Sequence, residues 1–329
     1  MKTDAPIALF APQATHRLGA AVAAALGTEL ARHEERRFAG GEFKIRPLES
    51  VRGRHAWVLQ SLYGTAGASA CDRLCEQLFL AGAIRDAGAE HVGLLFPYLA
   101  FARKDRRTKA RDPLTSRYVA QMCEAVGVDR VAAVEVHNPA AFENAHRIPA
   151  EHLSLTRMFA EHFAHRFSAA SVAVVSPDLG GSKRAQLLRE ALQRRIGGDV
   201  EFGCVEKRRS GDVVSGGRLV GEVAGRQVIV LDDLISSGDT MRRAARICRE
   251  AGARGVHAAA AHAPFAPDAL HNLAAPEFDS LTITDTVPLS GEASAALGYA
   301  TVLPVAELIA RATACIEGDG SLSDLLERG

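Results

Sequence analysis

The fold of this chain is constrained most by a regular alternation between short apolar runs and longer segments with helical periodicity. Segments such as residues 68–89 and 182–195 repeat apolar side chains at the spacing of a helix. Strands that alternate with helices form mainly parallel sheets with helices on both faces. The sequence therefore predicts an α/β fold, in which ligands bind at the carboxyl ends of strands. The predicted strands are IALFA, HAWVLQS, HVGLLFPY, RVAAVEV, SVAVVSP, EFGCVEK, RQVIVLDD, GVHAAAAHA and SLTITDT.

The length of the chain predicts two domains. With 329 residues the chain can form two domains of ordinary size, each with its own core. The Pro-containing stretch HRIPAEHL predicts a boundary near residue 152. We therefore expect one domain at residues 1–152, a second at 153–304, and a helical tail at 305–329 that packs on one of the two domains.

The composition argues against several classes of function. Lys+Arg and Asp+Glu both number 39, so no basic excess favours nucleic-acid binding. No run approaches the roughly 18 apolar residues that span a bilayer, and the chain does not start with a signal-like region. The six cysteines are scattered without the spacing of a zinc or redox motif, which indicates buried or free thiols. We expect a cytoplasmic protein without nucleic-acid or membrane partners.

The first candidate site is the segment that follows the apolar run 226–231. Asp232 and Asp233 come at the end of this run, and residues 236–240 (SSGDT) lead into a helical pattern. Two carboxylates at a strand end can hold sugar hydroxyls or Mg²⁺, while hydroxyls and backbone N–H groups at a helix start can bind phosphate. The same residues are also ordinary solvated-loop and N-cap chemistry. The local pattern leaves both interpretations open.

The second candidate site is a basic stretch at residues 96–112. Guanidinium groups pair bidentately with phosphate oxygens, so this stretch can bind a polyphosphate. The alternative is a solvated basic loop. Its cations are Arg103, Lys104, Arg106, Arg107, Lys109 and Arg111.

Three further segments place polar residues where a strand should end. Glu135 and His137 alternate out of an apolar run, and the His can ligate a metal through water, touch a phosphate, or be an ordinary core residue. Asp178 precedes Gly180 and Gly181, which indicates a metal-phosphate site or a simple turn. The cations of residues 207–209 (KRR) precede a stretch expected to be mobile, as in a lid that stabilises charge in a transition state.

Taken together, these segments resemble the ribose-phosphate pyrophosphokinases, also called phosphoribosyl pyrophosphate synthetases. The resemblance runs along nearly the whole chain, with the family blocks in the family order. The blocks are RFAGGE (37–42), ESVRG (49–53), PYLAFARKDRR (97–107), GVDRVAAVEVH (127–137), VVSPDLGGSKRA (174–185), EKRR (206–209), GEVAGRQVIVLDDLISSGDT (221–240) and TDTVPLS (284–290).

The resemblance implies a fold and a reaction. The fold is two tandem type I phosphoribosyltransferase-like domains, each a mainly parallel sheet flanked by helices. The N-terminal domain binds ATP and the C-terminal domain binds ribose 5-phosphate. The reaction transfers the diphosphoryl group of Mg-ATP to the C1 hydroxyl of ribose 5-phosphate, and gives phosphoribosyl pyrophosphate and AMP. The implied cofactor is Mg²⁺ and the implied assembly is a homo-oligomer.

The resemblance also implies roles for individual residues. Asp232 and Asp233 bind the ribose hydroxyls, and Lys207 and Arg209 are the catalytic cations. The residues that match the ATP-binding positions are Phe38, Glu42, Arg103, Lys104 and His137, the first two often serving a neighbouring subunit. The residues that match the metal positions are His137 and Asp178. The residues that match the 5-phosphate loop are Ser236, Ser237, Gly238, Asp239 and Thr240.

The 5-phosphate loop departs from the common family pattern D-D-x-x-D-T-G-G-T. Ser236 replaces the third Asp, Ser237 replaces the Thr, and Asp239 replaces the second Gly. The Asp239 carboxylate must point away from the phosphate or weaken its binding by repulsion. Lys104 also stands where Gln is usual, and Glu135 where Asp is usual. Another phosphosugar as the acceptor therefore stays open.

The regulatory site of the family matches only in part. The stretch after His137 lacks the usual Q-I-Q-G-F-F run, while Ser50, Arg52, Ser321 and Ser323 resemble other parts of that site. Phosphate activation, ADP inhibition and the choice among dimer, tetramer and hexamer stay open.

Two other functions compete with the synthetase, namely a non-catalytic regulatory homologue and a phosphoribosyltransferase. The complete set of catalytic residues argues against the first, and an ATP block in a second full domain argues against the other.

Overall fold

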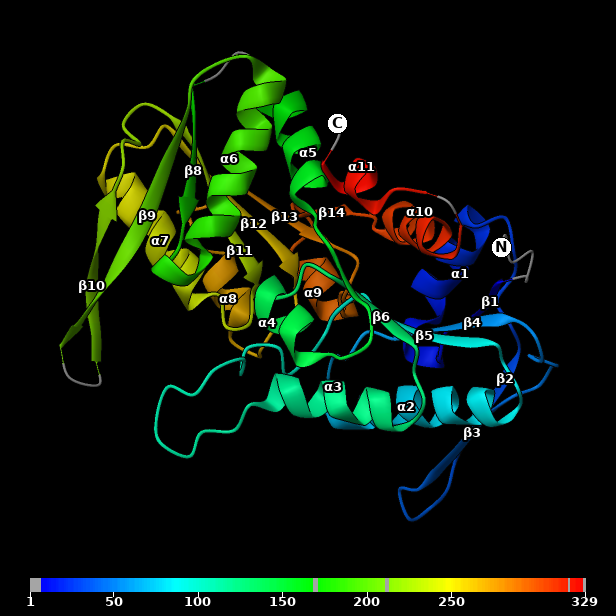
Figure 1. Cartoon of the computed structure of the whole chain (residues 1–329). Helices are drawn as coiled ribbons and strands as arrows, with labels where there is room; N and C mark the ends of the chain where they lie inside the picture. The colour runs from blue at the N-terminus through cyan, green and yellow to red at the C-terminus, as the bar shows by residue number, and fades with distance from the viewer. Residues whose placement is uncertain (1–6, 168–170, 211–212, 319, 328–329) are drawn as a thin grey trace. The chain divides into compact units, whose positions relative to one another are not determined.

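The chain folds into two compact units (Figure 1). The computed structural model describes residues 7–167, 171–210, 213–318 and 320–327, the side chains of 207–210, 213–216 and 327 excepted. Unit 1 comprises Met1–Ser154 together with Val305–Arg328, and unit 2 comprises Leu155–Pro304. Each unit is built on a mainly parallel sheet with flanking helices, so the predicted α/β class is confirmed.

Unit 1 contains a five-stranded parallel sheet with the strand order β1-β4-β5-β6-β7. β4 and the apolar part of β5 are buried throughout, as expected for central strands covered on both faces. His55, the first residue of β4, pairs with His91, the first residue of β5, so these strands begin at one edge of the sheet. The strands are β1 (Ile7–Phe10), β4 (His55–Leu59), β5 (His91–Phe96), β6 (Arg130–Val134) and β7 (Ala150–Leu153).

Helices cover both faces of this sheet, with α1 and α10 on one face and α2 and α3 on the other (Figure 1). α10 lies after unit 2 in the sequence, yet it packs against α1. The helices of unit 1 are η1 (Gln13–Thr15), α1 (His16–Ala25), α2 (Ala70–Asp86), α3 (Thr115–Ala125), α4 (Pro139–Ala145), α10 (Ala306–Glu317) and α11 (Leu322–Glu327).

A separate two-stranded antiparallel ribbon belongs to unit 1. It consists of β2 (His33–Arg37) and β3 (Phe43–Pro47), and β3 packs against α2. The tip of the ribbon projects away from α2 (Figure 1). The sequence did not predict these strands, because HEERR carries no apolar run and its side chains are largely exposed.

Unit 2 contains a seven-stranded sheet with the strand order β10-β9-β8-β11-β12-β13-β14. All its neighbouring strands are parallel except β10, which runs antiparallel to β9. The strands are β8 (Val172–Ser176), β9 (Val200–Ser210), β10 (Val213–Val220), β11 (Gln227–Leu234), β12 (Gly255–His262), β13 (Ser280–Thr284) and β14 (Thr301–Leu303). The helices are α5 (Thr156–Phe167), η2 (Leu179–Gly181), α6 (Ser182–Ile196), α7 (Asp239–Glu250), α8 (Ala269–Leu273) and α9 (Gly291–Ala296).

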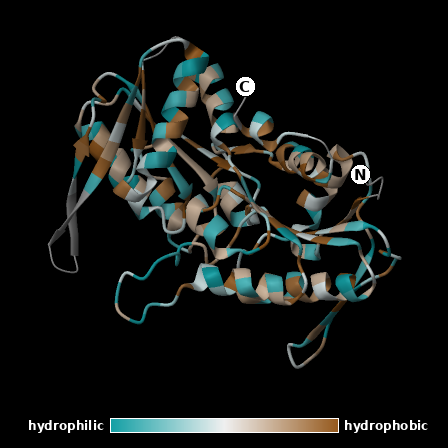
Figure 2. Cartoon of the chain, viewed as in Figure 1, coloured by the Kyte–Doolittle hydropathy of each residue, from teal (hydrophilic) through white to brown (hydrophobic). Residues whose placement is uncertain are grey.

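Every apolar run that was predicted to be a strand overlaps a strand of the structure. The hydropathy colouring shows the same contrast, with brown central strands and a mostly teal loop between β5 and α3 (Figure 2). Among the described residues, no helix is both long and apolar enough to cross a bilayer. All six cysteines are free thiols, as predicted.

Candidate functional site

The carboxyl end of β11 carries the acidic pair. Asp233 is buried with 4% exposure, and its Oδ1 lies 3.7 Å from Nη1 of Arg184 in α6. The backbone N–H of Asp233 donates to Oδ1 of Asp232 at 2.9 Å. β11 is a central strand, since β8 and β12 pair with it on either side. Two carboxylates are therefore held side by side where a parallel sheet binds its ligands.

The surroundings of Asp232 raise its pKa well above the usual value. Burial is the largest cause, followed by the negative charge of Asp233 and a hydrogen bond with that side chain. Arg184 acts in the opposite direction and offsets only part of the shift. Two close carboxylates cannot both ionise at low cost, so the pair favours a bound proton, a cation or a hydroxyl donor.

We expect Asp232→Asn to stabilise the ligand-free protein at neutral pH. A carboxyl group whose folded pKa is raised stabilises the fold below the unfolded pKa of about 3.9, and this contribution is lost as the pH rises through the folded pKa. Asn resembles the protonated form at every pH, so the advantage of the variant over the parent should grow from pH 4 to pH 7.5. Urea unfolding midpoints across this range measure it, and a constant difference between the two proteins would contradict the raised pKa.

The loop at residues 236–240 begins α7 with a glycine in the left-handed conformation. Gly238 has φ of 82° and is the N-cap of α7. A Cβ at this position would stand 3.2 Å from Cβ of Asn272, so a side chain here would be both strained and crowded. The following helix of 12 residues directs the free N–H groups of its first turn at this loop. The arrangement can bind an anion.

Asp239 is held by two neighbours, one of which the sequence did not reveal. Nδ2 of Asn272 in α8 donates to Oδ1 of Asp239 at 2.9 Å and to the carbonyl oxygen of Ser237 at 2.9 Å. The hydroxyl of Ser237 donates to Oδ2 of Asp239 at 2.9 Å. The direction of the carboxylate is thus fixed by the protein, and the Ser237 hydroxyl that could donate to a phosphate is committed to Asp239.

Asp178 follows β8 and acts as a helix cap. Its Oδ1 accepts hydrogen bonds from the N–H groups of Gly180 at 2.9 Å and Gly181 at 3.3 Å. Val230 of β11 pairs with Val175 of β8, so Asp178 and the acidic pair lie at the same edge of the unit 2 sheet. Both capping hydrogen bonds use the same carboxylate oxygen of Asp178, its Oδ1.

The cationic segment at residues 207–209 lies in a strand. The backbone of β9 continues to Ser210 and pairs with β10. The stretch after it, which the sequence predicts to be mobile, includes residues 211–212, and these lie outside the described residues. Cys204 is the last residue of β9 that pairs with β8, so Lys207 and Arg209 extend beyond the edge that carries Asp178. The side chains of Lys207 and Arg209 lie outside the described part of the structure.

In unit 1, the carboxylate of Asp112 makes several contacts within the basic loop between β5 and α3. Oδ2 of Asp112 accepts hydrogen bonds from the Thr108 hydroxyl at 2.7 Å and from the backbone N–H groups of Thr108 and Lys109 at 3.1 and 3.0 Å. These hydrogen bonds, led by that of the Thr108 side chain, lower the pKa of Asp112 to about 2. Lys104 lies 3.7 Å from the same oxygen. Arg103 is exposed, and its side chain makes no hydrogen bond or ion pair with another described residue.

The segment after β6 differs from the predicted strand. β6 ends at Val134, because Glu135 adopts φ of 41°, so Glu135 and His137 do not alternate out of a continuing strand. Glu135 is buried at 5% exposure and His137 is exposed. Nδ2 of Asn138 donates to Oδ2 of Asp105 at 2.6 Å, which ties this segment to the basic loop. Arg103, Lys104 and His137 are therefore on connected loops.

Phe38 and Glu42 lie in the turn of the β2–β3 ribbon. The N–H of Phe38 donates to the carbonyl oxygen of Glu42 at 2.8 Å, and the Phe38 ring is 42% exposed. The guanidinium carbon of Arg36 lies 5.1 Å from the centroid of this ring. The ribbon presents an exposed aromatic face and a carboxylate, the chemistry that stacks on and hydrogen-bonds a nucleobase.

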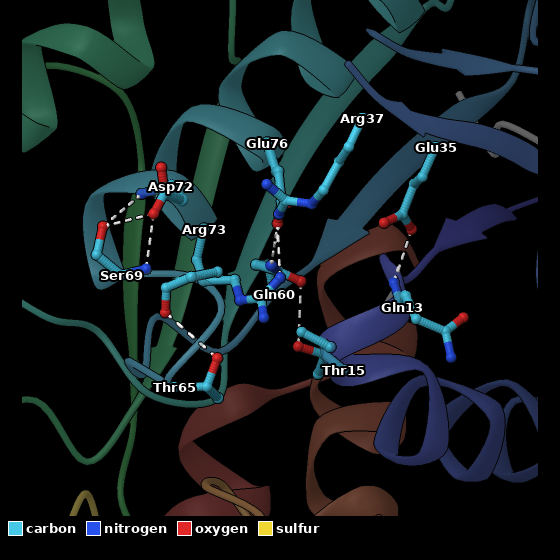
Figure 3. A network of polar contacts seen from close by, with 12 residues as sticks. Gln13, Thr15, Glu35, Arg37, Gln60, Thr65, Ser69, Asp72, Arg73 and Glu76 are labelled. Carbon is cyan, nitrogen blue, oxygen red and sulfur yellow. Dashed lines mark hydrogen bonds and ion pairs between the residues drawn. The ribbon is translucent and has the colours of Figure 1, made fainter. Parts of the chain in front are cut away.

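A buried network fixes the base of this ribbon (Figure 3). Glu76 of α2 is 3% exposed and accepts from Arg37 of β2, from Nη1 of Arg73 at 3.1 Å and from Nε2 of Gln60 at 3.3 Å. The hydroxyl of Thr15 donates to Oε1 of Gln60 at 3.1 Å. These donors satisfy the hydrogen-bonding capacity of a buried carboxylate. Glu76 and Gln60 position the residues of the RFAGGE block, although neither stands out in the sequence.

The predicted residues fall into three groups. In unit 2 the structure brings together Asp178, the acidic pair and the 236–240 loop at one sheet edge. In unit 1 it gathers Arg103, Lys104 and His137 after β5 and β6, while Phe38 and Glu42 lie on the separate ribbon. The three groups differ in chemistry: the first combines carboxylates with a helix start, the second is cationic, and the third pairs an aromatic ring with a carboxylate.

Comparison with known proteins gives a consistent result along the whole chain. Residues 7–127 match the family described as the N-terminal domain of ribose phosphate pyrophosphokinase, and residues 142–286 match the phosphoribosyl transferase domain. A protein of Streptococcus pyogenes serotype M3 named ribose-phosphate pyrophosphokinase 1 is 34% identical over 325 residues, which is 98% of both chains. A protein of the same name from Streptococcus pneumoniae serotype 4 is 35% identical over 288 residues, 86% of both chains.

A solved structure is similar over nearly the same extent. The crystal structure of phosphoribosylpyrophosphate synthetase from Mycobacterium smegmatis superimposes with a TM-score of 0.85 at 30% identity, and the match covers 94% of this chain and 99% of that one. The prediction of two tandem phosphoribosyltransferase-like domains is confirmed by this match together with the family matches.

Proposed function

The chain belongs to the ribose-phosphate pyrophosphokinase family, and from this premise we propose how its residues divide the work of the reaction. The enzyme transfers the diphosphoryl group of ATP to the C1 hydroxyl of ribose 5-phosphate, and gives phosphoribosyl pyrophosphate and AMP. Transfer of this kind depends mostly on positioning and charge neutralisation. The single observation that carries the assignment is the acidic strand end of β11 leading directly into an anion-binding helix start.

In the proposed assignment, unit 2 binds ribose 5-phosphate. Asp232 and Asp233 accept hydrogen bonds from the ribose hydroxyls, an arrangement that suits the high pKa of Asp232. The 5-phosphate binds the loop from Ser236 to Thr240 at the N-terminus of α7, where helix N–H groups favour an anion. The ribose and its phosphate thus use neighbouring parts of one strand-to-helix connection.

The proposed ATP site is in unit 1. Arg103 and Lys104 contact the phosphates, since both are exposed cations on the loop that contains Asp112. Phe38 and Glu42 contact the adenine, and the projecting ribbon that carries them can serve a neighbouring copy of the chain. This role for the ribbon supports a homo-oligomer as the working assembly.

The cofactor proposed for this reaction is Mg²⁺, which neutralises the phosphate charge when it is bound. Mg²⁺ prefers hard oxygen ligands such as carboxylates. The repulsion between Asp232 and Asp233 contributes to the raised pKa of Asp232, so a cation would be stabilised at this sheet edge, which also carries Asp178. His137 of unit 1 and Asp178 of unit 2 are each proposed as a ligand of Mg²⁺, directly or through water. Lys207 and Arg209 would stabilise the charge that develops on the transferring group.

We also place the enzyme in the cytoplasm, because its six free cysteines suit a reducing compartment.

A single incubation tests the proposed function. The purified chain is mixed with Mg-ATP and ribose 5-phosphate, and AMP and phosphoribosyl pyrophosphate are measured by chromatography. We expect equimolar formation of both products. Other pentose and hexose phosphates are offered in parallel, because the departures of residues 236–240 from the family pattern can change which sugar phosphate is accepted. Absence of AMP with every acceptor and at every phosphate concentration would favour a regulatory homologue instead.

Asp239 gives a sharper test of the 5-phosphate loop. We expect Asp239→Asn to lower the KM for ribose 5-phosphate about fivefold, because one negative charge near the phosphate costs about 1 kcal/mol. Asn can keep the hydrogen bond from Asn272, while its amide N–H donates to the Ser237 hydroxyl in place of the reverse hydrogen bond, so the change removes the charge and retains both neighbours. Asp239→Gly serves as the companion variant, since it also releases the Ser237 hydroxyl. An unchanged KM in both variants would place the phosphate elsewhere.

A further inference from the structure

A cluster of metal-ligating side chains lies at the opposite edge of the unit 1 sheet from the proposed ATP site. His55 and His91 are the first residues of the neighbouring strands β4 and β5, and they face each other in the strand register. Glu90 precedes His91. One potential ligand atom from each of these three residues lies within 4.8 Å of the others. The ATP-binding loops follow the carboxyl ends of the same strands, so the cluster is separate from that site.

The His55 ring is prepared as a metal ligand by its second nitrogen. Nδ1 of His55 is hydrogen-bonded to Oε2 of Glu317 at the end of α10, and a carboxylate partner holds the proton on Nδ1. Nε2 then carries a free lone pair. This atom is buried and has no hydrogen-bond partner among the described residues, and the His55 side chain is 8% exposed. A carboxylate that orients a histidine in this way is the usual outer partner of a metal-bound imidazole.

Glu317 itself is held rigidly. Its Oε1 accepts a hydrogen bond from Nε1 of Trp57 at 2.6 Å, while its Oε2 is bonded to His55. Trp57 is 1% exposed in the middle of β4. Both carboxylate oxygens are therefore used, and Glu317 positions the His55 ring rather than competing with it as a ligand.

The charges around the cluster leave room for a cation. The guanidinium groups of Arg54 and Arg85 are committed, the first to Glu49 and the second to Asp129. The carboxylate of Glu90 forms no hydrogen bond or ion pair with any described residue. The backbone N–H of Glu90 donates to the carbonyl oxygen of Arg54 at 3.0 Å, which keeps Glu90 beside the start of β4. No described cation neutralises this carboxylate.

From this geometry we propose that His55, His91 and Glu90 bind a divalent transition-metal ion, with Zn²⁺ as the best fit. Two imidazoles and one carboxylate are a donor set that zinc favours, with a fourth position left for water. Tetrahedral ligands at about 2.1 Å from the metal stand about 3.4 Å apart, so ligand atoms that lie within 4.8 Å of one another must close by up to about 1.4 Å. His91 and Glu90 are exposed and can rotate to do so. The bound ion would tie β4, β5 and, through Glu317, α10 into one structural unit.

Metal titration of the full chain tests this proposal. Protein freed of metal with EDTA is titrated with Zn²⁺ against a chromophoric chelator, without nucleotide. We expect one tight equivalent per chain, and a visible absorption band of tetrahedral Co²⁺ when Co²⁺ replaces Zn²⁺. His91→Ala should lose this equivalent and the Co²⁺ band while keeping its turnover, because His91 is exposed and distant in the sheet from the ATP loops. Glu317→Gln should keep the stoichiometry but weaken binding about tenfold.

Two control variants separate this site from others. His165→Ala removes an exposed histidine of α5 and should bind Zn²⁺ as the parent does. His137→Ala alters the proposed substrate site and should also retain the equivalent. The proposal is overturned if the parent binds no Zn²⁺ stoichiometrically, if His91→Ala binds it like the parent, or if only His137→Ala loses it.

Discussion

Replacing Lys207 by Ala is expected to lower kcat about 10²-fold or more, with little change in the KM for ribose 5-phosphate. A cation that acts mainly on charge developing in the transition state contributes to turnover rather than to ground-state binding. Lys207 lies in the part of β9 that extends beyond the sheet edge carrying Asp178 and the acidic pair, so its backbone is placed for this role. Initial rates of AMP formation at saturating substrates measure the effect.

Arg208→Ala is the matched control for this experiment. It removes one positive charge from the adjacent position, to which the family resemblance assigns no role. We expect it to retain turnover within a few fold. Equal losses in Lys207→Ala and Arg208→Ala would indicate a general effect of positive charge on β9. An unchanged kcat in Lys207→Ala would refute its catalytic role.

Asp233→Asn is expected to lower kcat/KM for ribose 5-phosphate about 10²-fold. A hydrogen bond to a charged group contributes about 1.5 to 3 kcal/mol, and the substitution removes the charge while keeping the shape. It should also destabilise the fold, because Arg184 loses the carboxylate that lies 3.7 Å away. Asp233→Asn should therefore lower the free energy of unfolding, whereas Asp232→Asn should raise it, although the two residues are adjacent.

Steady-state kinetics and urea unfolding of the same preparations separate the two consequences of Asp233→Asn. Asp199→Asn changes an exposed Asp of unit 2 before β9 and should alter neither quantity. If Asp233→Asn keeps the parent kcat/KM, the acidic pair does not bind the sugar. If it loses activity but gains stability, the ion pair with Arg184 is not a net stabilising contact.

The strands that the sequence predicted are those that the sheets bury. Runs such as VAVVS at β8 are apolar because helices cover both faces, so burial leaves a direct trace in the sequence. The missed strands are edge or ribbon strands. In β7, which reads AEHL, only Leu153 is buried. β14 has three residues, and none of these three is buried. Such strands are defined by the backbone partner beside them, which a local pattern does not contain.

The residues of the candidate site also divide into those that a local sequence pattern reveals and those that only the folded structure reveals. Asp232, Asp178 and His137 could be found because each is a polar residue that follows an apolar run, which is a local pattern of the sequence. Their partners do not stand out. Asn272 holds Asp239 from 33 residues away, and Glu76 fixes Arg37 from 39 residues away, so both contacts exist only once the chain has folded.

Glu135 illustrates a different limit. Its apolar neighbours predict a continuing strand, yet its backbone adopts φ of 41° and ends β6 one residue earlier. A left-handed conformation at a residue other than glycine is costly, so it persists only where the surrounding structure imposes it. The alternation of side chains could not reveal this.

The position of α10 has a consequence for the order in which the protein is made. Residues 155–304 form unit 2, but Val305–Arg328, which follow them in the chain, belong to unit 1. On the ribosome, unit 2 therefore emerges in full before unit 1 receives α10 and the Glu317 carboxylate that engages Trp57 and His55. Unit 1 is thus begun first and completed last. Until α10 has been synthesised, α1 lacks the helix against which it packs, and the nascent chain presents apolar surface to chaperones.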